Sequence, residues 1–221
     1  MMCIVQTKNL KKYYNLGKNM IKAVDGISLD VKDGEFLAIV GSSGSGKTTL
    51  LNLIGGLDIP TDGKVIVNHV DITHMNENQL SIFRRRNIGF VFQNYNLISN
   101  LNVIENIILP IELDGNRIPR DDIEDILSVL KLTDNKYIYP SHLSGGQQQR
   151  VAIARALATK PSIILADEPT GNLDSKTGQD VMGLLKRANQ LYKQTIIMIT
   201  HNEDIAQLAD RMIRIEDGKL R

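Results

Sequence analysis

The sequence has no tryptophan, only 5% aromatic residues and a single cysteine, Cys3. Few aromatic side chains leave little surface for stacking on bases, and 26 basic residues against 25 acidic ones give a net charge of +1. We therefore expect no nucleic-acid partner. One cysteine excludes a disulfide framework and a multi-cysteine zinc site. Cys3 is better interpreted as a small apolar residue in a first strand.

Long hydrophobic runs are also missing. Apolar runs such as Phe36–Val40 and Thr195–Thr200 are far shorter than the ~18–20 residues that span a bilayer. Met1–Leu10 lacks the long apolar core of a signal peptide and leads into Lys11 and Lys12. We expect a cytoplasmic chain, so another chain must supply any part that spans a membrane.

The 221 residues instead show apolar runs of strand length that alternate with longer amphipathic stretches. This alternation favours a three-layer α/β fold, and the strands that are apolar almost throughout suit the centre of a parallel sheet. Strands are predicted at Phe36–Val40, Val65–Asn68, Ile88–Phe92, Ile163–Ala166, Thr195–Thr200 and Met212–Ile215. Helices are predicted at Lys47–Leu57, Asn78–Arg86, Ile123–Leu130, Ser144–Ala158, Thr177–Leu191 and Asp204–Ala209.

Two regions do not fit a single wound sheet. In the first 35 residues, the alternating stretch Ile21–Val31 predicts an antiparallel strand pair. Between Asn94 and Thr159 there is no convincing strand, which indicates an inserted helical subdomain. We expect one domain over residues 1–221, with residues 1–93 and 160–221 forming the β subdomain and core and residues 94–159 the helical subdomain.

A glycine-rich segment directly after the strand at Phe36–Val40 fits the pattern G-x-x-x-x-G-K-[ST]. Its residues are Gly41, Ser42, Ser43, Gly44, Ser45, Gly46, Lys47 and Thr48, followed by Thr49. Glycines let backbone amides point inward at phosphates, and the start of the following helix attracts anions. Lys47 would then contact the β- and γ-phosphates, and Thr48 would ligate Mg²⁺. A merely flexible turn would not need Lys-Thr-Thr at the start of a helix.

The predicted strand at Ile163–Ala166 ends in two carboxylates, Asp167 and Glu168. Beside a phosphate loop, Asp167 is the expected partner of the Mg²⁺ held by Thr48. Glu168 can orient the water that attacks the γ-phosphate and accept its proton. Taken alone, a solvated acidic strand end would be the simpler interpretation.

A second anion-binding helix start follows Leu143. It consists of Ser144, Gly145, Gly146 and Gln147. One nucleotide needs only one such cradle. We therefore expect this one to contact the phosphate of a nucleotide held by another copy, which gives two identical composite sites in a two-fold dimer. A glycine-rich helix cap is the alternative.

In this order, residues 41–48, 143–147 and 163–168 resemble the nucleotide-binding subunit of an ATP-binding-cassette (ABC) transporter, and the resemblance covers essentially the whole chain. It implies a P-loop NTPase core with a mostly parallel sheet, ATP and Mg²⁺ as ligands, and ATP hydrolysis coupled to transport. It also implies roles for single residues: Gln93 senses Mg²⁺ and the attacking water, His201 contacts the γ-phosphate and holds Glu168, Asp174 orders the opposite site of the dimer, and Tyr14 (or Tyr13) stacks on adenine.

Residues 90–97, 143–156 and 167–175 further resemble the lipoprotein-releasing, macrolide-exporting and antimicrobial-peptide-resistance branch. That branch implies a separately encoded permease, attachment at the inner face of the cell membrane, and docking of the permease on Tyr95–Ile107. Buried packing within the helical subdomain is the alternative for about half of the apolar positions in that segment. Alternatives are a cell-division-type ATPase that acts on a membrane partner without transport and a soluble non-transport ABC ATPase. A small P-loop kinase and a non-catalytic nucleotide-gated module are weaker candidates, because the first has no use for the second cradle and the second would be expected to lack Glu168 or His201.

Overall fold

The computed structural model describes residues 3–17 and 19–221. The strands are β1 (Cys3–Leu16), β2 (Asn19–Lys32), β3 (Phe36–Val40), β4 (Asp62–Val67), β5 (Val70–Asp71), β6 (Ile88–Phe92), β7 (Ile163–Asp167), β8 (Thr195–Ile199), β9 (Arg211–Glu216) and β10 (Lys219–Leu220). The α-helices are α1 (Lys47–Ile54), α2 (Glu77–Asn87), α3 (Val103–Leu113), α4 (Arg120–Val129), α5 (Gly145–Ala158), α6 (Ser175–Tyr192) and α7 (Glu203–Ala206). Short 3-10 turns lie at Thr133–Asn135 and Pro140–His142.

A six-stranded sheet in the order β10-β9-β3-β8-β7-β6 forms the centre of the molecule. From β9 to β6 all neighbouring strands are parallel, and only β10 runs antiparallel to β9. Every residue of β3 and of β8 is buried, because helices cover both faces of these strands. The mostly parallel sheet predicted from the sequence is confirmed.

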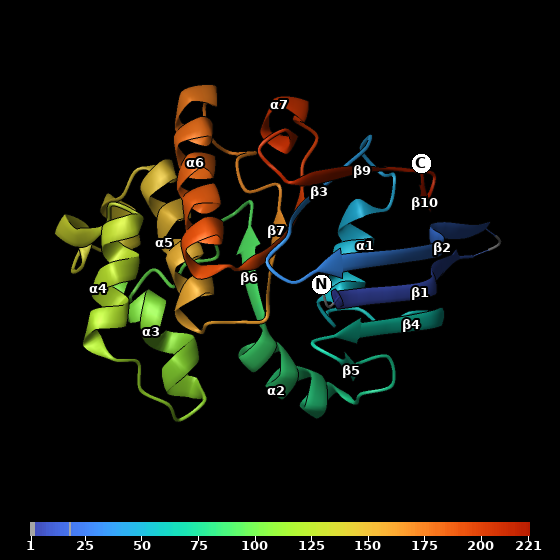
Figure 1. Ribbon diagram of the computed structural model, residues 1–221, viewed down its shortest axis with the longest axis horizontal. Coiled ribbons are helices and arrows are strands. Elements are labelled where there is room, and N and C mark those ends of the chain that lie inside the picture. Colours follow the sequence, from blue (N-terminus) through green and yellow to red (C-terminus); the bar gives the residue numbers. More distant parts are fainter. Residues whose placement is uncertain (1–2, 18) are drawn as a thin grey trace.

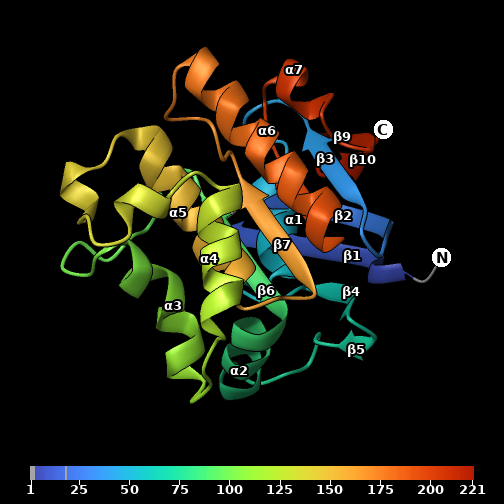
Figure 2. The same cartoon turned by 60° about the vertical axis from the view of Figure 1, so that its left-hand side comes forward.

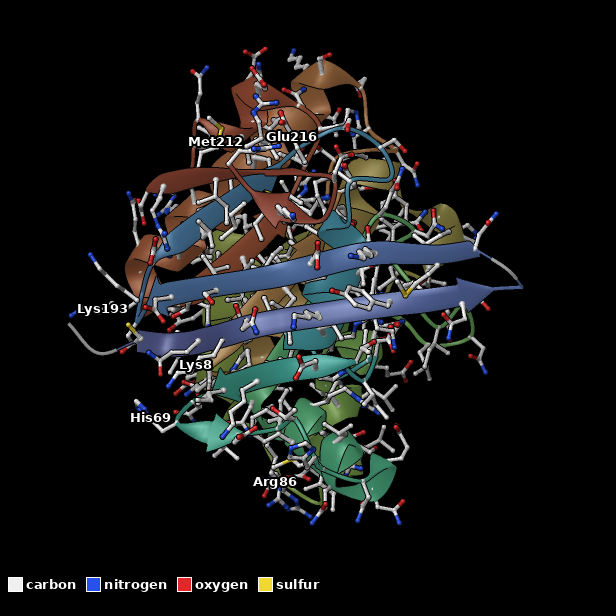
Figure 3. All side chains as sticks on the ribbon, turned by 90° about the vertical axis from the view of Figure 1, so that its right-hand side faces the viewer. Lys8, His69, Arg86, Lys193, Met212 and Glu216 are labelled. Carbon is white, nitrogen blue, oxygen red and sulfur yellow. The ribbon has the colours of Figure 1, made fainter. Side chains whose placement is uncertain are left out.

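A second sheet, in the order β2-β1-β4-β5, is antiparallel and covers one side of the molecule (Figures 1 and 3). The predicted N-terminal antiparallel pair is therefore confirmed, with β4 and β5 added to it. Helix α1 lies between the two sheets (Figure 1). Its buried residues Leu50, Leu51, Leu53 and Ile54 join the inner residues of both sheets in one hydrophobic cluster. This packing fixes the start of α1, and with it the preceding glycine-rich loop.

Helices α3, α4, α5 and α6 gather on the opposite side of the central sheet (Figures 1 and 2). Helix α3 was not among the predicted helices, and its first residues fall in the expected docking segment Tyr95–Ile107, about half of whose apolar positions had burial as the alternative. Within residues 95–107, Val103 and Ile107 are fully buried, whereas Ile98 is 40% exposed. The exposed part of the expected docking segment therefore ends where α3 begins.

Other boundaries shift by a few residues. Helix α1 ends at Ile54 rather than Leu57, because Gly56 adopts a φ of 62° that ends the helix. Helix α7 ends at Ala206 rather than Ala209. Cys3 lies partly buried in β1, as expected for a residue of a first strand. Among the described residues, no helix has both the length and the apolar character needed to cross a membrane.

Candidate active site

The carboxyl ends of four neighbouring parallel strands carry the main predicted site residues. In the order β3, β8, β7 and β6, the site residues within two positions of the strand ends are Gly41, His201, Glu168 and Gln93. The register aligns these ends, since Ile199 of β8 lies opposite Asp167 of β7, and Asp167 lies opposite Phe92 of β6. Ligands of open α/β sheets bind at this edge. The structure thus brings together groups that are up to 160 positions apart in the chain.

The glycine-rich loop has a shape that only glycine allows at two positions. Gly41 (φ 155°) and Gly46 (φ 102°) have positive φ angles. A Cβ atom added to Gly41 would lie 2.2 Å from the Ile215 carbonyl oxygen, and one added to Gly46 would lie 1.9 Å from the Ala23 carbonyl oxygen. The loop is therefore pressed against two other chain segments, and no larger residue fits at either position.

Lys47 lies folded against this loop. Its Nζ donates to the carbonyl oxygens of Gly41 at 2.9 Å and Ser42 at 2.7 Å. The hydroxyl of Ser45 is buried and has no hydrogen-bond partner in the described part of the chain. Helix α1 begins at Lys47 without a side-chain cap, so its first backbone amides are free to bind an anion. A cation, an unpaired hydroxyl and free amides together suit a nucleotide phosphate.

A cavity of about 520 Å³ opens at the loop. Its walls are Met20, Ile21, Lys22, Ala23, Gly44, Gly46, Lys47, Thr48, Thr49, Asp217 and Gly218. The contributions of β2 and of the β9–β10 turn were not foreseen, because neither segment carries a local phosphate-binding pattern. Their position depends on long-range strand pairing, which the sequence shows only after the fold is known.

Thr48 and Asp167 form the candidate Mg²⁺ site. The Thr48 hydroxyl donates to Asp167 Oδ1 at 3.4 Å. Burial, and then the neighbouring charge of Glu168, raise the pKa of Asp167 above its ordinary value. The Thr48 hydroxyl and the desolvated Asp167 carboxylate suit a hard cation such as Mg²⁺, which would complete its coordination shell with phosphates and water. No cluster of three histidine, cysteine or acidic side chains able to hold a metal occurs in residues 3–17 and 19–221.

Replacing Asp167 with asparagine is expected to stabilise the nucleotide-free chain at about pH 8 by a few degrees in Tm. Since the folded-state pKa of Asp167 is raised, the folded chain binds this proton more readily than the unfolded chain, and the ionised carboxylate lowers stability at high pH. The difference in Tm between the variant and the unchanged chain should shrink as the pH falls to about 4. Thermal unfolding of both chains across this range tests it, and a lower Tm for the variant at high pH would contradict it.

Glu168 and His201 are in direct contact. His201 Nδ1 lies 2.9 Å from Glu168 Oε2, and the His201 backbone N–H donates to the same oxygen at 3.3 Å. Glu168 itself has a φ of 47°, in the left-handed region, and its backbone N–H donates to the Ile199 carbonyl at 3.0 Å. The end of β8 therefore holds the Glu168 carboxylate in place, as a general base requires.

Gln93 faces the loop before α6. Its Nε2 donates to Asn172 Oδ1 at 3.1 Å, and Asn172 Nδ2 donates back to the Gln93 carbonyl at 3.0 Å. Gln93 also packs on Gly171, where an added Cβ would lie 2.6 Å from its Nε2. The structure thus joins Gln93 to Asn172 rather than to Asp167, a pairing that the sequence analysis did not foresee.

Asp174 caps helix α6. Its Oδ1 accepts from the Thr177 N–H at 3.0 Å, and its hydrogen bonds to Thr177 hold the pKa of Asp174 below its usual value. This is a structural use of the residue that leaves one face of the carboxylate open to solvent.

Ser144 begins helix α5 in a capping box. Its Oγ accepts from the Gln147 N–H at 3.3 Å, and Gln147 Oε1 accepts from the Ser144 N–H at 2.8 Å. The two glycines lie tightly packed, since an added Cβ would come within 2.8 Å of Tyr95 Oη at Gly145 and 2.4 Å of Thr177 Cγ2 at Gly146. This cradle does not belong to the walls of the phosphate-loop cavity, as far as the described residues form them.

The two candidate adenine-stacking tyrosines point to different partners. Tyr14 donates its hydroxyl to Asp58 Oδ2 at 2.6 Å and is 38% exposed. Tyr13 donates to Asp25 Oδ1 at 2.5 Å. Tyr14 also interacts with Thr49, directly after the phosphate loop, and this contact opposes the rise that burial causes in the Tyr14 pKa. Neither ring belongs to the walls of the cavity.

The fold and these groups together define an ATPase of the P-loop class with a second helix-start cradle. Residues 24–171 match the family model described as ABC transporter, which is more than half of the chain. The chain therefore belongs to the ABC transporter family, and it is an ATP-binding subunit and ATPase of that family.

Similar proteins agree with this assignment. An uncharacterized ABC transporter ATP-binding protein of Methanocaldococcus jannaschii, MJ0796, is 44% identical over 98% of this chain and 95% of its own length. Its solved dimeric structure in a post-hydrolysis state, bound to ADP and Pi, superposes with a TM-score of 0.88 at 42% identity and covers 98% of this chain and 96% of that one. The macrolide export ATP-binding/permease protein MacB of Brucella melitensis is 45% identical over 98% of this chain, which spans only 34% of MacB.

Proposed function

We propose that two copies of this chain, closed around ATP, power a membrane transporter of the lipoprotein-releasing, macrolide-exporting or peptide-resistance type. Each copy would attach to a separately encoded permease at the inner face of the membrane. Within each copy, residues 1–93 and 160–221 bind the nucleotide, and residues 94–159 form the helical subdomain that presents Ser144 to the other copy.

The observation that carries this proposal is the separation of the two phosphate cradles. The cavity at the phosphate loop has Lys47 and Thr48 in its walls but none of Ser144–Gln147, while α5 presents those four residues from the helical side. A second cradle that its own site does not use is explained if it covers a nucleotide bound by another copy. The dimeric structures of MJ0796 support this arrangement.

Hydrolysis follows from the groups at the strand ends. Lys47, released from the Gly41 and Ser42 carbonyls, neutralises the β- and γ-phosphates. The oxygen of a water attacks the γ-phosphorus, the bond to the β–γ bridging oxygen breaks, and the proton of the water passes to Glu168. His201 keeps Glu168 oriented through the 2.9 Å contact. ADP and phosphate then no longer join the two copies.

Mg²⁺ held by Thr48 and Asp167 would supply positive charge against the phosphate oxygens. Their 3.4 Å contact brings the Thr48 and Asp167 oxygens together, and the burial that raises the pKa of Asp167 is offset when a cation lies beside its ionised carboxylate. We assign adenine stacking to Tyr14, since its hydroxyl is tied to Asp58 and its neighbour Thr49 follows the phosphate loop.

The proposed branch rests on relatives in which the ATPase and the permease are one chain. Several MacB proteins match this chain over 31–34% of their own length. We propose that a separately encoded permease docks on the exposed stretch between Gln93 and α3. Ile98 is 40% exposed there, while the rest of the segment turns inward at Val103.

A cross-linking experiment tests the docking. Ile98→Cys in a Cys3→Ser chain should form a disulfide with a cysteine-substituted coupling helix of the membrane protein encoded beside it, and Lys8→Cys should not. Lys8 is exposed on β1, in the antiparallel sheet that faces the viewer in Figure 3. Equal cross-linking at both positions, or at neither, would contradict the assignment. A cell-division-type system would cross-link in the same way but carry no cargo, which a transport assay separates.

A further inference from the structure

Arg155 extends from α5 to the segment that follows Gln93. Its Nη1 donates to the Asn96 carbonyl at 2.6 Å, and its Nη2 donates to the Tyr95 carbonyl at 2.9 Å. Burial lowers the pKa of the Arg155 guanidinium, and no carboxylate offsets this in the part of the chain that the structure describes. A desolvated cation whose partners are two backbone carbonyls does not form an ion pair. Instead, Arg155 stabilises the backbone conformation of Tyr95 and Asn96.

The backbone that it holds is strained. Tyr95 (φ 56°) and Asn96 (φ 48°) are consecutive residues in the left-handed region, which L-residues adopt rarely and tyrosine more rarely than asparagine. Such a pair persists only where its surroundings stabilise it. The rigid, planar fork of arginine matches two neighbouring carbonyls, whereas the single ammonium of a lysine does not.

The same segment touches α5 at a second point. An added Cβ on Gly145, in the first turn, would lie 2.8 Å from Tyr95 Oη. Gly145 and Arg155 are separated by ten residues of helix, or about 15 Å. The Tyr95 hydroxyl thus packs against Gly145 at the N-terminal end of α5. The Tyr95 carbonyl accepts from Arg155, which lies near the other end of the same helix. The N-terminal end of α5 is the Ser144 cradle, and the residue two positions before Tyr95 is Gln93.

We propose that Arg155 is a positioning residue for ATP hydrolysis. It locks the segment after Gln93 to the helix that carries Ser144, so that Gln93, the docking segment and the cradle for the other copy move as one unit. The proposal rests on the role that the family resemblance implies for Gln93 and on the role proposed above for Ser144. It adds a residue that touches neither nucleotide nor partner and acts through Tyr95 and Asn96.

The test compares Arg155→Met, Arg155→Lys and the unchanged chain. The affinity of the single chain for ATP should stay within about twofold, because the phosphate-loop cavity does not include Arg155. The kcat at saturating ATP should fall about 10- to 100-fold for Arg155→Met and less for Arg155→Lys, which can still donate to one carbonyl. Hydrogen exchange at the Tyr95 and Asn96 amides should become faster in both variants.

Ile126→Val is the control for a general loss of stability. Ile126 is 4% exposed in α4, and the change removes one buried methylene at a position outside both α5 and residues 94–98. It should lower Tm while leaving kcat and the local exchange unchanged. If Arg155→Met behaves in the same way, or if its local exchange rises while kcat stays at the wild-type value, the positioning role is wrong.

The test of the Arg155 role can be distinguished from the test of the composite nucleotide site. Should the Glu168→Gln chain fail to dimerise with ATP, the composite site is wrong. The exchange rates at Tyr95 and Asn96, measured on the single chain, and the kcat of the Arg155 variants still decide the role of Arg155.

Discussion

Glu168→Gln is expected to lower the rate of ATP hydrolysis by about 10²- to 10⁴-fold and to convert the chain into a long-lived ATP-bound dimer. Glutamine fills the same space and can accept from the His201 N–H, but it cannot take the proton of the attacking water. Binding of ATP should be unimpaired, because Lys47 and the loop amides are untouched. If hydrolysis separates the two copies, as proposed above, its loss should trap them together.

Size-exclusion chromatography with and without Mg²⁺-ATP, together with phosphate release, measures both effects. Glu112→Gln is a matched control, because Glu112 is an exposed glutamate near the C-terminal end of α3, outside the residues that follow the strands of the central sheet. It should hydrolyse ATP at the normal rate and stay monomeric after turnover. Normal turnover by Glu168→Gln would refute its role as the base, and a strictly monomeric Glu168→Gln chain at saturating ATP would refute the composite site.

Ser144→Asp is expected to abolish ATP-driven dimerisation and to reduce hydrolysis by 10²-fold or more, in the range seen when one stabilising group is lost from a transition state. Aspartate is as good a helix cap as serine, so α5 should still begin at the same place. Its charge, however, would face the γ-phosphate of the other copy. Ser144→Asn keeps the cap without the charge and should retain most of the activity, at an unchanged Tm.

Mixing two inactive chains gives the sharpest form of this test. Lys47→Ala removes the phosphate-loop cation, and Ser144→Asp removes the cradle. In a mixed dimer, one site has both defects and the other has neither. Equal amounts of the two chains should therefore recover roughly a quarter of the normal rate if the two sites act independently. No recovery would show that each chain completes its own site, whereas equal defects of Ser144→Asp and Ser144→Asn would show that Ser144 is only a cap.

The site residues could be predicted where the chemistry is local. The phosphate loop, Asp167, Glu168 and the Ser144 cradle each depend on a short string beside a strand or a helix start, and the structure places all of them at one edge of the sheet or at the start of α5. His201 and Gln93 became recognisable only through the family resemblance. A lone histidine or glutamine after a strand carries no chemical pattern of its own.

What could not be predicted depends on contacts between distant segments. The walls of the cavity from β2 and from Asp217–Gly218 follow from strand pairing. Helix α3 was not predicted, and Pro110 inside it is unusual for a helix interior, although Asn102 and Glu105 form a capping box that marks its start. Arg155 resembles any basic residue of an amphipathic helix until its two carbonyl partners are seen.

The packing of the phosphate loop has a consequence for protein synthesis. The loop is translated early, yet its shape depends on residues made much later: the Ile215 carbonyl lies against Gly41, and the Gly218 N–H donates to the Ser45 carbonyl at 3.0 Å. A nascent chain that has passed Thr48 but not yet reached β9 lacks these contacts, and an incomplete domain does not hold its native loops. We therefore expect such a ribosome-bound fragment to bind nucleotide poorly until β9 and the turn after it have been made and have folded against the loop.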